Sequence, residues 1–109
     1  MSNPNAPVHN LVIYRPKAGH YDQLKAILLQ HGPALAKSGL IVEGRPVELW
    51  HAKDLPRHGE TEPYFVESFY WRDAKAPELA HQMPEIMSVW ETMGPHLEDM
   101  RLTNLESLT

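Results

Sequence analysis

A carboxylate inside a predicted strand and a histidine shortly after it are the residues of this chain best suited to chemistry. Glu67 lies in the middle of the run YFVESFYW, and His81 follows Trp71 at a spacing of ten residues. A buried carboxylate can act as a general base or anchor a substrate, and an imidazole can shuttle protons near neutral pH. We therefore predict catalytic roles for Glu67 and His81. The alternatives are an ion pair of Glu67 with Arg15, Arg45 or a partner chain, and a packed His81 with one satisfied nitrogen.

Four further residues are candidates for contact with a ligand. His31 falls on the apolar side of a predicted helix, where it is either a histidine at the edge of the core or a second polar group in a pocket. The tryptophans either fill a core or an interface, or form a wall against which a flat aromatic ligand stacks. We predict substrate contacts for Trp71, His31, Phe69 and Trp90.

Neither a metal site nor a bound cofactor is predicted. His51, His58 and Glu60 lack the H-x-x-x-H spacing of a helical metal site, and no other close ligand pair accompanies them. The chain has no cysteine, which excludes a thiol nucleophile, a disulfide framework and a Cys-ligated zinc. It also contains no Gly-rich phosphate loop, dinucleotide fingerprint or Ser-His-Asp order.

Alternating and helical patterns predict the elements that position these residues. Alternating residues predict strands over 9–15, 46–53, 64–71 and 100–108. Helical spacing of apolar residues predicts a helix over 20–37, with a kink or break near Gly32 because Pro33 lacks an N–H. Asp73 is suited to be the N-cap of a helix from about residue 74, and Pro84 to begin a second helical segment that ends at Gly94-Pro95.

The predicted order β-α-β-β-α-β is that of the α+β ferredoxin-like fold, whose antiparallel sheet carries both helices on one face. The strands bear apolar residues on both sides, although a half-solvated sheet would alternate apolar and polar ones. A second copy of the same sheet is the simplest cover for the other face, which predicts a homodimer. Because a helix-covered face is the less favourable place for a charge, we expect Glu67 to point away from the helices.

The chain has 109 residues, which predicts one domain over residues 8–108 preceded by a flexible tail over residues 1–7. Its net charge of −4 and its scattered Lys and Arg argue against nucleic acid as a partner. The N-terminus has neither the basic nor the apolar region of a signal peptide, and no apolar run approaches the roughly 20 residues that span a bilayer. We expect a cytoplasmic protein without membrane contact.

Three segments of the chain, VIYRPKAG, VESFYWRD and AHQMPEIMSVWETM, resemble those of the dimeric α/β-barrel superfamily. The resemblance covers roughly residues 8–108 and is greatest with small proteins like the antibiotic biosynthesis monooxygenases. It implies a pocket between the sheet and the helices or within a dimeric barrel. Members of this superfamily include cofactor-free quinol monooxygenases, haem-degrading enzymes, isomerases and proteins without a settled reaction.

The haem-degrading members of the superfamily use an Asn, a Trp and a His. The resemblance offers Trp71 and His81 for the last two. The first-strand position expected for the Asn is nearest Val12, whereas Asn10 lies two residues earlier. This departure argues against haem breakdown.

The resemblance and the residues together favour a cofactor-independent monooxygenase that acts on a small flat hydrophobic molecule such as a phenol, a quinol or a polyketide. In this hypothesis His81 or Glu67 removes a phenolic proton, and the electron-rich anion reacts with O₂ in a dry pocket. One alternative is a dimer that only binds a small ligand or has a structural role. Another is an isomerase or lyase that uses Glu67 as base and needs no O₂.

Overall fold

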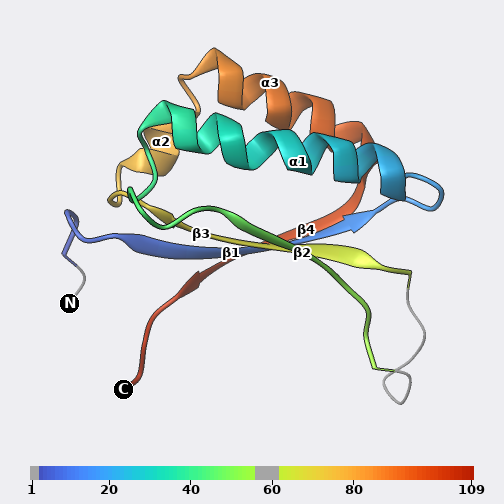
Figure 1. The fold of residues 1–109 in the computed structure, drawn as a ribbon, viewed down its shortest axis with the longest axis horizontal. Coiled ribbons are helices and arrows are strands. Elements are labelled where there is room, and N and C mark those ends of the chain that lie inside the picture. The colour runs from blue at the N-terminus through green and yellow to red at the C-terminus, as the bar shows by residue number, and fades with distance from the viewer. Residues whose placement is uncertain (1–2, 56–61) are drawn as a thin grey trace.

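The computed structural model describes residues 3–55 and 62–109, which form one layer of helices on one four-stranded sheet (Figure 1). The order of elements confirms the predicted ferredoxin-like α+β fold. In chain order the elements are β1 (Val8–Pro16), α1 (Tyr21–Ser38), β2 (Glu48–Ala52), β3 (Tyr64–Trp71), α2 (Ala76–Ala80), α3 (Pro84–Met93), a 3₁₀ turn (Gly94–His96) and β4 (Leu97–Leu105).

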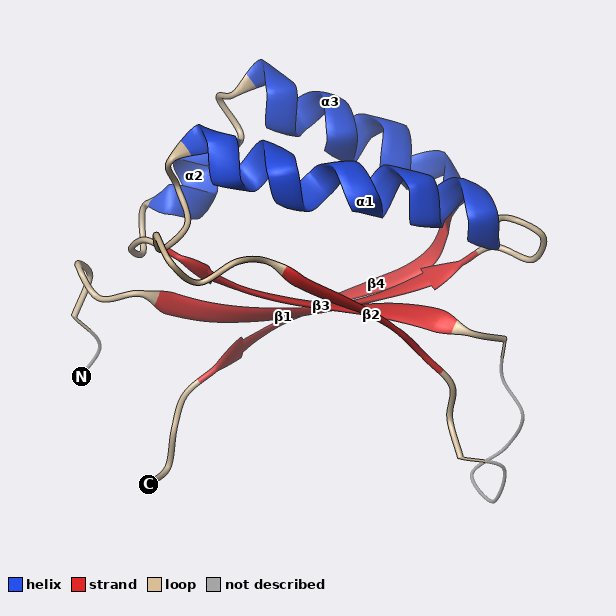
Figure 2. Ribbon diagram, viewed as in Figure 1, coloured by secondary structure: helices blue, strands red, loops and turns tan. Residues whose placement is uncertain are grey.

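The sheet has the strand order β2-β3-β1-β4, and every neighbouring pair is antiparallel. β1 and β3 therefore lie at the centre, with Val12 opposite Glu67 and Asn10 opposite Phe69. All three α-helices cover the same face of the sheet, and the other face carries no helix (Figure 2). Glu67 thus lies on a central strand of the sheet.

Helix α1 is continuous through Pro33, so it has no break near Gly32, and the alternative of a kink there stays a prediction. Proline removes one backbone donor from the helix, but Pro33 is exposed, and water can satisfy the carbonyl that its missing N–H leaves free. The buried side of α1 holds its apolar stripe on the sheet. The helix ends after Ser38, one residue later than predicted, because Gly39 adopts a left-handed conformation with φ of 77°.

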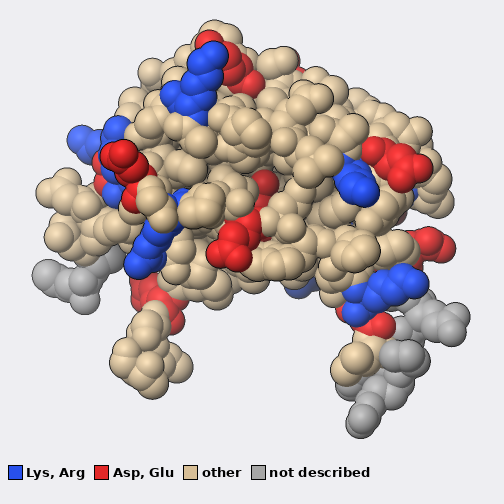
Figure 3. All heavy atoms as spheres, viewed as in Figure 1, with Lys and Arg blue, Asp and Glu red and all other residues tan. Residues whose placement is uncertain are grey.

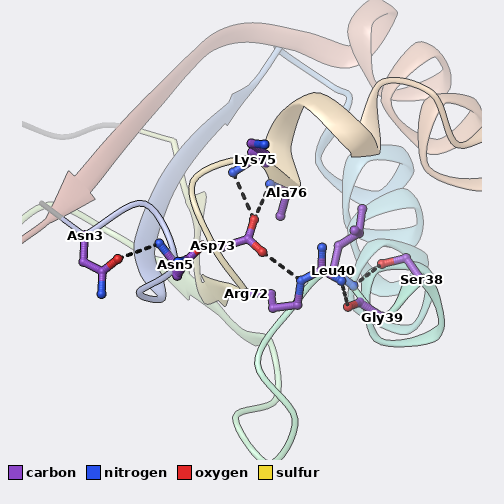
Figure 4. Close-up of polar contacts among 9 residues, drawn as sticks. All are labelled: Asn3, Asn5, Ser38, Gly39, Leu40, Arg72, Asp73, Lys75 and Ala76. Atoms are coloured by element: carbon purple, nitrogen blue, oxygen red, sulfur yellow. Dashed lines mark hydrogen bonds and ion pairs between the residues drawn. The ribbon is translucent and has the colours of Figure 1, made fainter.

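The turn between β3 and α2 is held by Asp73 (Figure 4). One oxygen of its carboxylate accepts hydrogen bonds from the backbone N–H groups of Lys75 and Ala76, both at 3.0 Å. The other oxygen accepts a hydrogen bond from the guanidinium of Arg72, and this bond is the largest cause that lowers the pKa of Asp73. The helix itself begins at Ala76, about two residues later than the sequence predicts.

The last strand also differs from the prediction, because β4 runs from Leu97 to Leu105 rather than over residues 100–108. Its bounds are set by pairing with β1, in which Leu97 lies opposite Pro16 and Leu105 opposite His9. The weak alternation of apolar and polar residues in this segment does not show which residues of β1 it pairs with. Antiparallel register fixes a strand end that local pattern leaves undefined.

The N-terminal residues predicted to be a flexible tail make two backbone hydrogen bonds from residue 3 onward. Ala6 N–H donates to the carbonyl of Asn3, and Ala74 N–H donates to the carbonyl of Pro4. The side chain of Asn3 also accepts a hydrogen bond from the N–H of Asn5 (Figure 4). These contacts place the segment beside the β3–α2 turn, while its mobility stays a prediction.

The core lies between the helices and the covered face of the sheet. It includes Leu24, Leu28 and Leu35 of α1 and Ile86 of α3, all almost completely buried. Glu67 is 0% exposed and lies in this layer, so the prediction that it points away from the helices is wrong. The reason is that α1 supplies a polar partner for it, which the apolar character of the helix stripe concealed.

The bare face of the sheet is apolar near its centre. Leu11 and Ile13 of β1 and Val66 of β3 are only half-buried there, and Trp50 of β2 is 47% exposed. Residues 106–109 after β4 and residues 53–55 after β2 project beyond this face on opposite sides (Figure 2). The prediction of a sheet with two apolar faces is thus confirmed for the single chain.

Candidate functional site

A cavity of about 590 Å³ lies between the sheet and helices α2 and α3. β4 forms its open side, where Leu102 is 63% exposed although it lines the cavity. The walls are largely apolar and aromatic, which is typical of a site for a small hydrophobic molecule. Its lining residues include every predicted site residue except Glu67: His31, Phe69, Trp71, His81 and Trp90.

Four polar side chains, buried or half-buried, form a hydrogen-bonded network behind one wall of this cavity. Tyr14 of β1 donates a hydrogen bond from its hydroxyl to Oε1 of Glu67 at 2.6 Å. Nδ1 of His31 lies 3.0 Å from Oε1 and 2.9 Å from Oε2 of the same carboxylate. The indole N–H of Trp90, on α3, donates to Nε2 of His31 at 2.9 Å. This hydrogen-bonded network therefore joins both central strands to α1 and α3.

The hydrogen-bond donors in this network determine which nitrogen of His31 carries the proton. An indole N–H can only donate, so Nε2 of His31 must be an acceptor without a proton. A neutral imidazole then carries its proton on Nδ1, which donates to Glu67. Glu67 accepts from His31 and from Tyr14, as suits an ionised carboxylate. The arrangement holds an unprotonated imidazole nitrogen beside the cavity wall.

The hydroxyl of Tyr14 remains a donor over a wide range of pH. Burial raises the pKa of Tyr14 well above its ordinary value, and the charge of Glu67 and the hydrogen bond to it raise it further. A second negative charge next to a buried carboxylate is strongly disfavoured. Tyr14 therefore stabilises the charge of Glu67 rather than competing for its proton.

His81, at the C-terminal end of α2, lies on the cavity wall and is exposed. Its ring stands edge-on to that of Trp90, with 4.9 Å between the ring centroids. His81 can thus contact a ligand in the cavity directly, whereas Glu67 has no exposed surface and could influence a ligand only through neighbouring side chains. The structure brings the two predicted catalytic residues to the same region without direct contact between them.

Asn10 is a polar wall residue that the sequence did not single out as a site residue. It is 5% exposed, lines the cavity, and its amide makes no side-chain hydrogen bond with the described part of the chain. Asn104 of β4 lies directly opposite in the register and also lines the cavity. Because alternate residues of β1 share a face, Asn10 and Val12 both point into the cavity. The displacement by two residues therefore does not remove the amide from the site.

The sequence alone also did not identify Tyr14 as a site residue. Its position next to Glu67 depends on the register between β1 and β3. On β1 it lies opposite Phe65, which makes it the diagonal neighbour of Glu67 on the covered face. Once Val12 is aligned with Glu67, a tyrosine two residues further on becomes the obvious donor. The sequence contains both residues but not the alignment of the strands.

The described residues also bear on the sequence predictions about a metal-ion site and membrane-spanning helices. His58 and Glu60 lie outside the described residues; within residues 3–55 and 62–109 no three His, Asp or Glu side chains are placed to hold a metal ion. Of the helices described, none has both the length and the hydropathy needed to cross a bilayer. In the view of Figure 3, Lys and Arg are interspersed with Asp and Glu and form no basic stripe.

Comparison with solved structures places the chain in a defined class of folds. It is similar to a mutant of SnoaB, a cofactor-independent oxygenase from Streptomyces nogalater, with a TM-score of 0.71, 12% identity and 94% of each chain covered. It is also similar to an antibiotic biosynthesis monooxygenase, with a TM-score of 0.70, 13% identity, and coverage of 94% of this chain and 99% of that one. The fold is therefore that of the antibiotic biosynthesis monooxygenase-like proteins, as the sequence resemblance predicts.

A third similar structure is Rv0793 from Mycobacterium tuberculosis, with a TM-score of 0.68, 19% identity, and coverage of 95% of this chain and 97% of that one. No family model matches the sequence, and no curated protein sequence matches it. At these identities the likeness establishes the fold and leaves the reaction to be argued from the site.

Proposed function

We propose that this protein is a cofactor-independent monooxygenase-like enzyme that oxidises a small, flat aromatic hydroxyl compound such as a phenol, a quinol or a polyketide. The observation that carries the proposal is the apolar cavity with an unprotonated imidazole beside its wall. Named oxygenases with this fold support the class of reaction. Aromatic walls from Phe69, Trp71 and Trp90 suit a planar ligand.

The reaction needs one base and O₂. The base takes the hydroxyl proton, and a ring carbon of the phenolate forms a bond to O₂ to give a peroxide anion. The protonated base returns its proton to that anion, which becomes a hydroperoxide. The O–O bond then breaks as the C–H electrons of that carbon form a carbonyl, and the leaving hydroxide takes up the proton and departs as water. The substrate supplies all four electrons, so one O₂ gives one new carbonyl and one water. His81, or His31 backed by Glu67, can accept the first proton.

Oxygen uptake with a panel of naphthols, hydroquinones and anthrones tests this proposal. We expect one O₂ consumed for each quinone formed, with ¹⁸O₂ label in the product carbonyl. Leu102→Trp, which fills the open side of the cavity, should abolish turnover, whereas Leu29→Trp on the exposed side of α1 should not. Product formation without O₂ uptake would instead support an isomerase or lyase. Binding without any turnover would support a protein that only binds its ligand.

We also propose that a second copy of the chain covers the bare face, to form the dimeric barrel. The half-buried Leu11, Ile13 and Val66 and the exposed Trp50 give this face the apolar centre that a stable interface needs. Two identical faces can pair around a two-fold axis. Native mass spectrometry should show twice the mass of 12.5 kDa, and a monomer at micromolar concentration would contradict this.

Haem as a substrate is the second candidate, and the position of Asn10 favours it. Asn10, Trp71 and His81 line one cavity, which is the set of residue types that the resemblance implies for haem breakdown. An imidazole is a common axial ligand of haem iron, and apolar walls suit a porphyrin. Titration with hemin should give a Soret band that His81→Ala loses and His96→Ala retains. No change in the hemin spectrum would exclude this candidate.

A further inference from the structure

We propose that His31 is the residue that accepts the substrate's proton, and that the indole N–H of Trp90 holds its place until a ligand hydroxyl replaces it. The inference deepens the proposed function and rests on it in one respect, because an aromatic hydroxyl compound must enter the cavity. It assigns a specific exchange: the ligand O–H donates to Nε2 of His31 in place of the Trp90 N–H.

The first argument is the state of the imidazole. Nε2 of His31 accepts a hydrogen bond from Trp90, and Nδ1–H donates to Glu67 at 2.9 Å. A proton that arrives at Nε2 creates an imidazolium whose other N–H already faces a carboxylate. This is the arrangement by which a buried carboxylate orients a catalytic histidine and stabilises its charged form.

The second argument is access. His31 is 2% exposed, yet it lines the cavity together with Trp90, which is only half-buried. The indole that occupies Nε2 thus belongs to a cavity wall rather than to the packed core. A ligand hydroxyl that displaces the indole restores one hydrogen bond for the one lost, so the exchange leaves no buried acceptor unsatisfied.

The third argument concerns the groups that face His31. Glu67 of β3 and, behind it, Tyr14 of β1 are the titratable side chains on the sheet side, and Phe69 meets the ring edge-on at 6.1 Å between centroids. On the helix side Trp90 separates His31 from His81. Since Tyr14 donates to Glu67 and stays protonated, the carboxylate charge remains available to the imidazolium.

This chemistry defines a substrate class. The ligand must carry an acidic hydroxyl, a phenol or an enol, at the edge of a flat apolar body. An alcohol would bind without losing its proton, and an ether could not donate to Nε2 at all.

Spectroscopic titration with para-nitrophenol tests the proposal, because only its ionised form absorbs visible light strongly. With the wild-type protein, at a pH slightly below the ionisation of the free compound, we expect the bound compound to be ionised. Glu67→Gln, which keeps the shape and removes the charge, should bind it mainly in the neutral form. His96→Gln, the control at an imidazole that does not line the cavity, should leave ionisation unchanged.

Trp90→Phe gives the sharper result, because it removes the competing donor and keeps an aromatic ring. We expect para-nitrophenol to bind roughly 2- to 10-fold more tightly to this variant than to wild type, the factor that one net hydrogen bond corresponds to. A purely structural role for the indole predicts equal or weaker binding.

The outcomes separate the two proposals. If para-nitrophenol binds but stays neutral in wild type, or ionises equally in Glu67→Gln, the role of His31 is wrong while the cavity assignment stands. Equal or weaker binding by Trp90→Phe also overturns it. If neither wild type nor Trp90→Phe binds the compound at any concentration up to its solubility, the proposed function fails together with this inference.

Discussion

Along β3 the side chains alternate between two environments that differ in almost every physical respect. Phe65, Glu67, Phe69 and Trp71 point toward the helices and are 0–5% exposed. Tyr64, Val66, Ser68 and Tyr70 point to the bare face and are half-buried. The covered face holds a carboxylate with every polar partner satisfied, beside an apolar cavity. The bare face holds polar groups that are only half-buried around an apolar centre.

The comparison shows that a charge is buried where partners are available, and not where the surroundings are most polar on average. On the bare face the polar side chains, such as those of His9 and Ser68, remain partly exposed to water. The covered face offers the hydroxyl of Tyr14 and the imidazole of His31, which together can offset the loss of hydration. Two hydrogen-bond donors therefore outweighed the apolar character of the helix-covered layer.

Bare-face polar groups behave differently, and Tyr70 illustrates this. The ring of His9 stacks on Tyr70 with 4.1 Å between centroids, and the guanidinium of Arg45 lies 4.2 Å from the centre of the same ring. These groups remain partly in water, so their interactions contribute less to stability than those of the buried hydrogen-bonded network. The two faces should therefore respond very differently to the same type of substitution.

Removal of the carboxylate at the covered face should have the largest effect on folding. Glu67→Ala leaves the hydroxyl of Tyr14 and Nδ1–H of His31 buried without an acceptor, at about 1–3 kcal/mol for each group. We expect the free energy of unfolding, measured with urea, to fall by roughly 2–5 kcal/mol. Glu48→Ala, at an exposed position on β2, should change it by less than about 0.5 kcal/mol. Equal effects of the two substitutions would contradict the account of the covered face.

At the bare face a charge should break association and leave the fold intact. Leu11→Asp places a carboxylate at the centre of the proposed interface, where an unpaired buried charge costs several kcal/mol. We expect the dimer dissociation constant, measured by analytical ultracentrifugation, to rise by at least about 100-fold, with a circular dichroism spectrum unchanged. Leu29→Asp, the same change on the exposed side of α1, is the matched control. A folded dimer from Leu11→Asp would contradict the proposed interface.

The raised pKa of Tyr14 predicts a specific pH dependence of stability. Above the ordinary value of 10.0, the unfolded chain loses the phenol proton while the folded protein retains it. Stability that Tyr14 confers is therefore complete below about pH 10 and falls as the pH rises toward the folded-state pKa, by about 1.4 kcal/mol per pH unit.

Tyr14→Phe should be less stable than wild type at about pH 8 by roughly 1–3 kcal/mol, because Glu67 loses a hydrogen bond. The difference should shrink above about pH 10, as wild type loses the contribution that the variant lacks. Urea unfolding of both proteins across this range measures it. A difference that stays constant to about pH 11 would show that the hydroxyl of Tyr14 does not titrate as its burial implies.

The smallest effect on the free energy of unfolding is expected at Ser68, the residue next to Glu67. Ser68 lies next to Glu67 but on the bare face, where its hydroxyl is 2.6 Å from Nε2 of His9 and both groups are half-buried. Ser68→Ala should lower the free energy of unfolding by only about 0.5–1 kcal/mol, because it removes one hydrogen bond between two neutral side chains. An effect as large as that of Glu67→Ala would contradict the distinction between the two faces.

The fold could be predicted from sequence further than the site could. Strand and helix periods give the element order, and they locate the end of α3 at Gly94. Local patterns misplace β4, because only pairing with β1 defines its bounds. The predicted site residues do surround or support one cavity, but the roles of Asn10 and Tyr14 depend on a strand register that no local pattern contains.

By itself, the sequence determined the ferredoxin-like order, the two apolar faces of the sheet and the residue types around the site, because period and composition act locally along the chain. Only the tertiary structure decided which face receives Glu67, which nitrogen of His31 carries the proton and which side chains enclose the cavity. These depend on donors and acceptors that meet across strands and helices distant in sequence. A carboxylate's environment is set by its nearest partners in space, and the chain brings those partners together only when it folds.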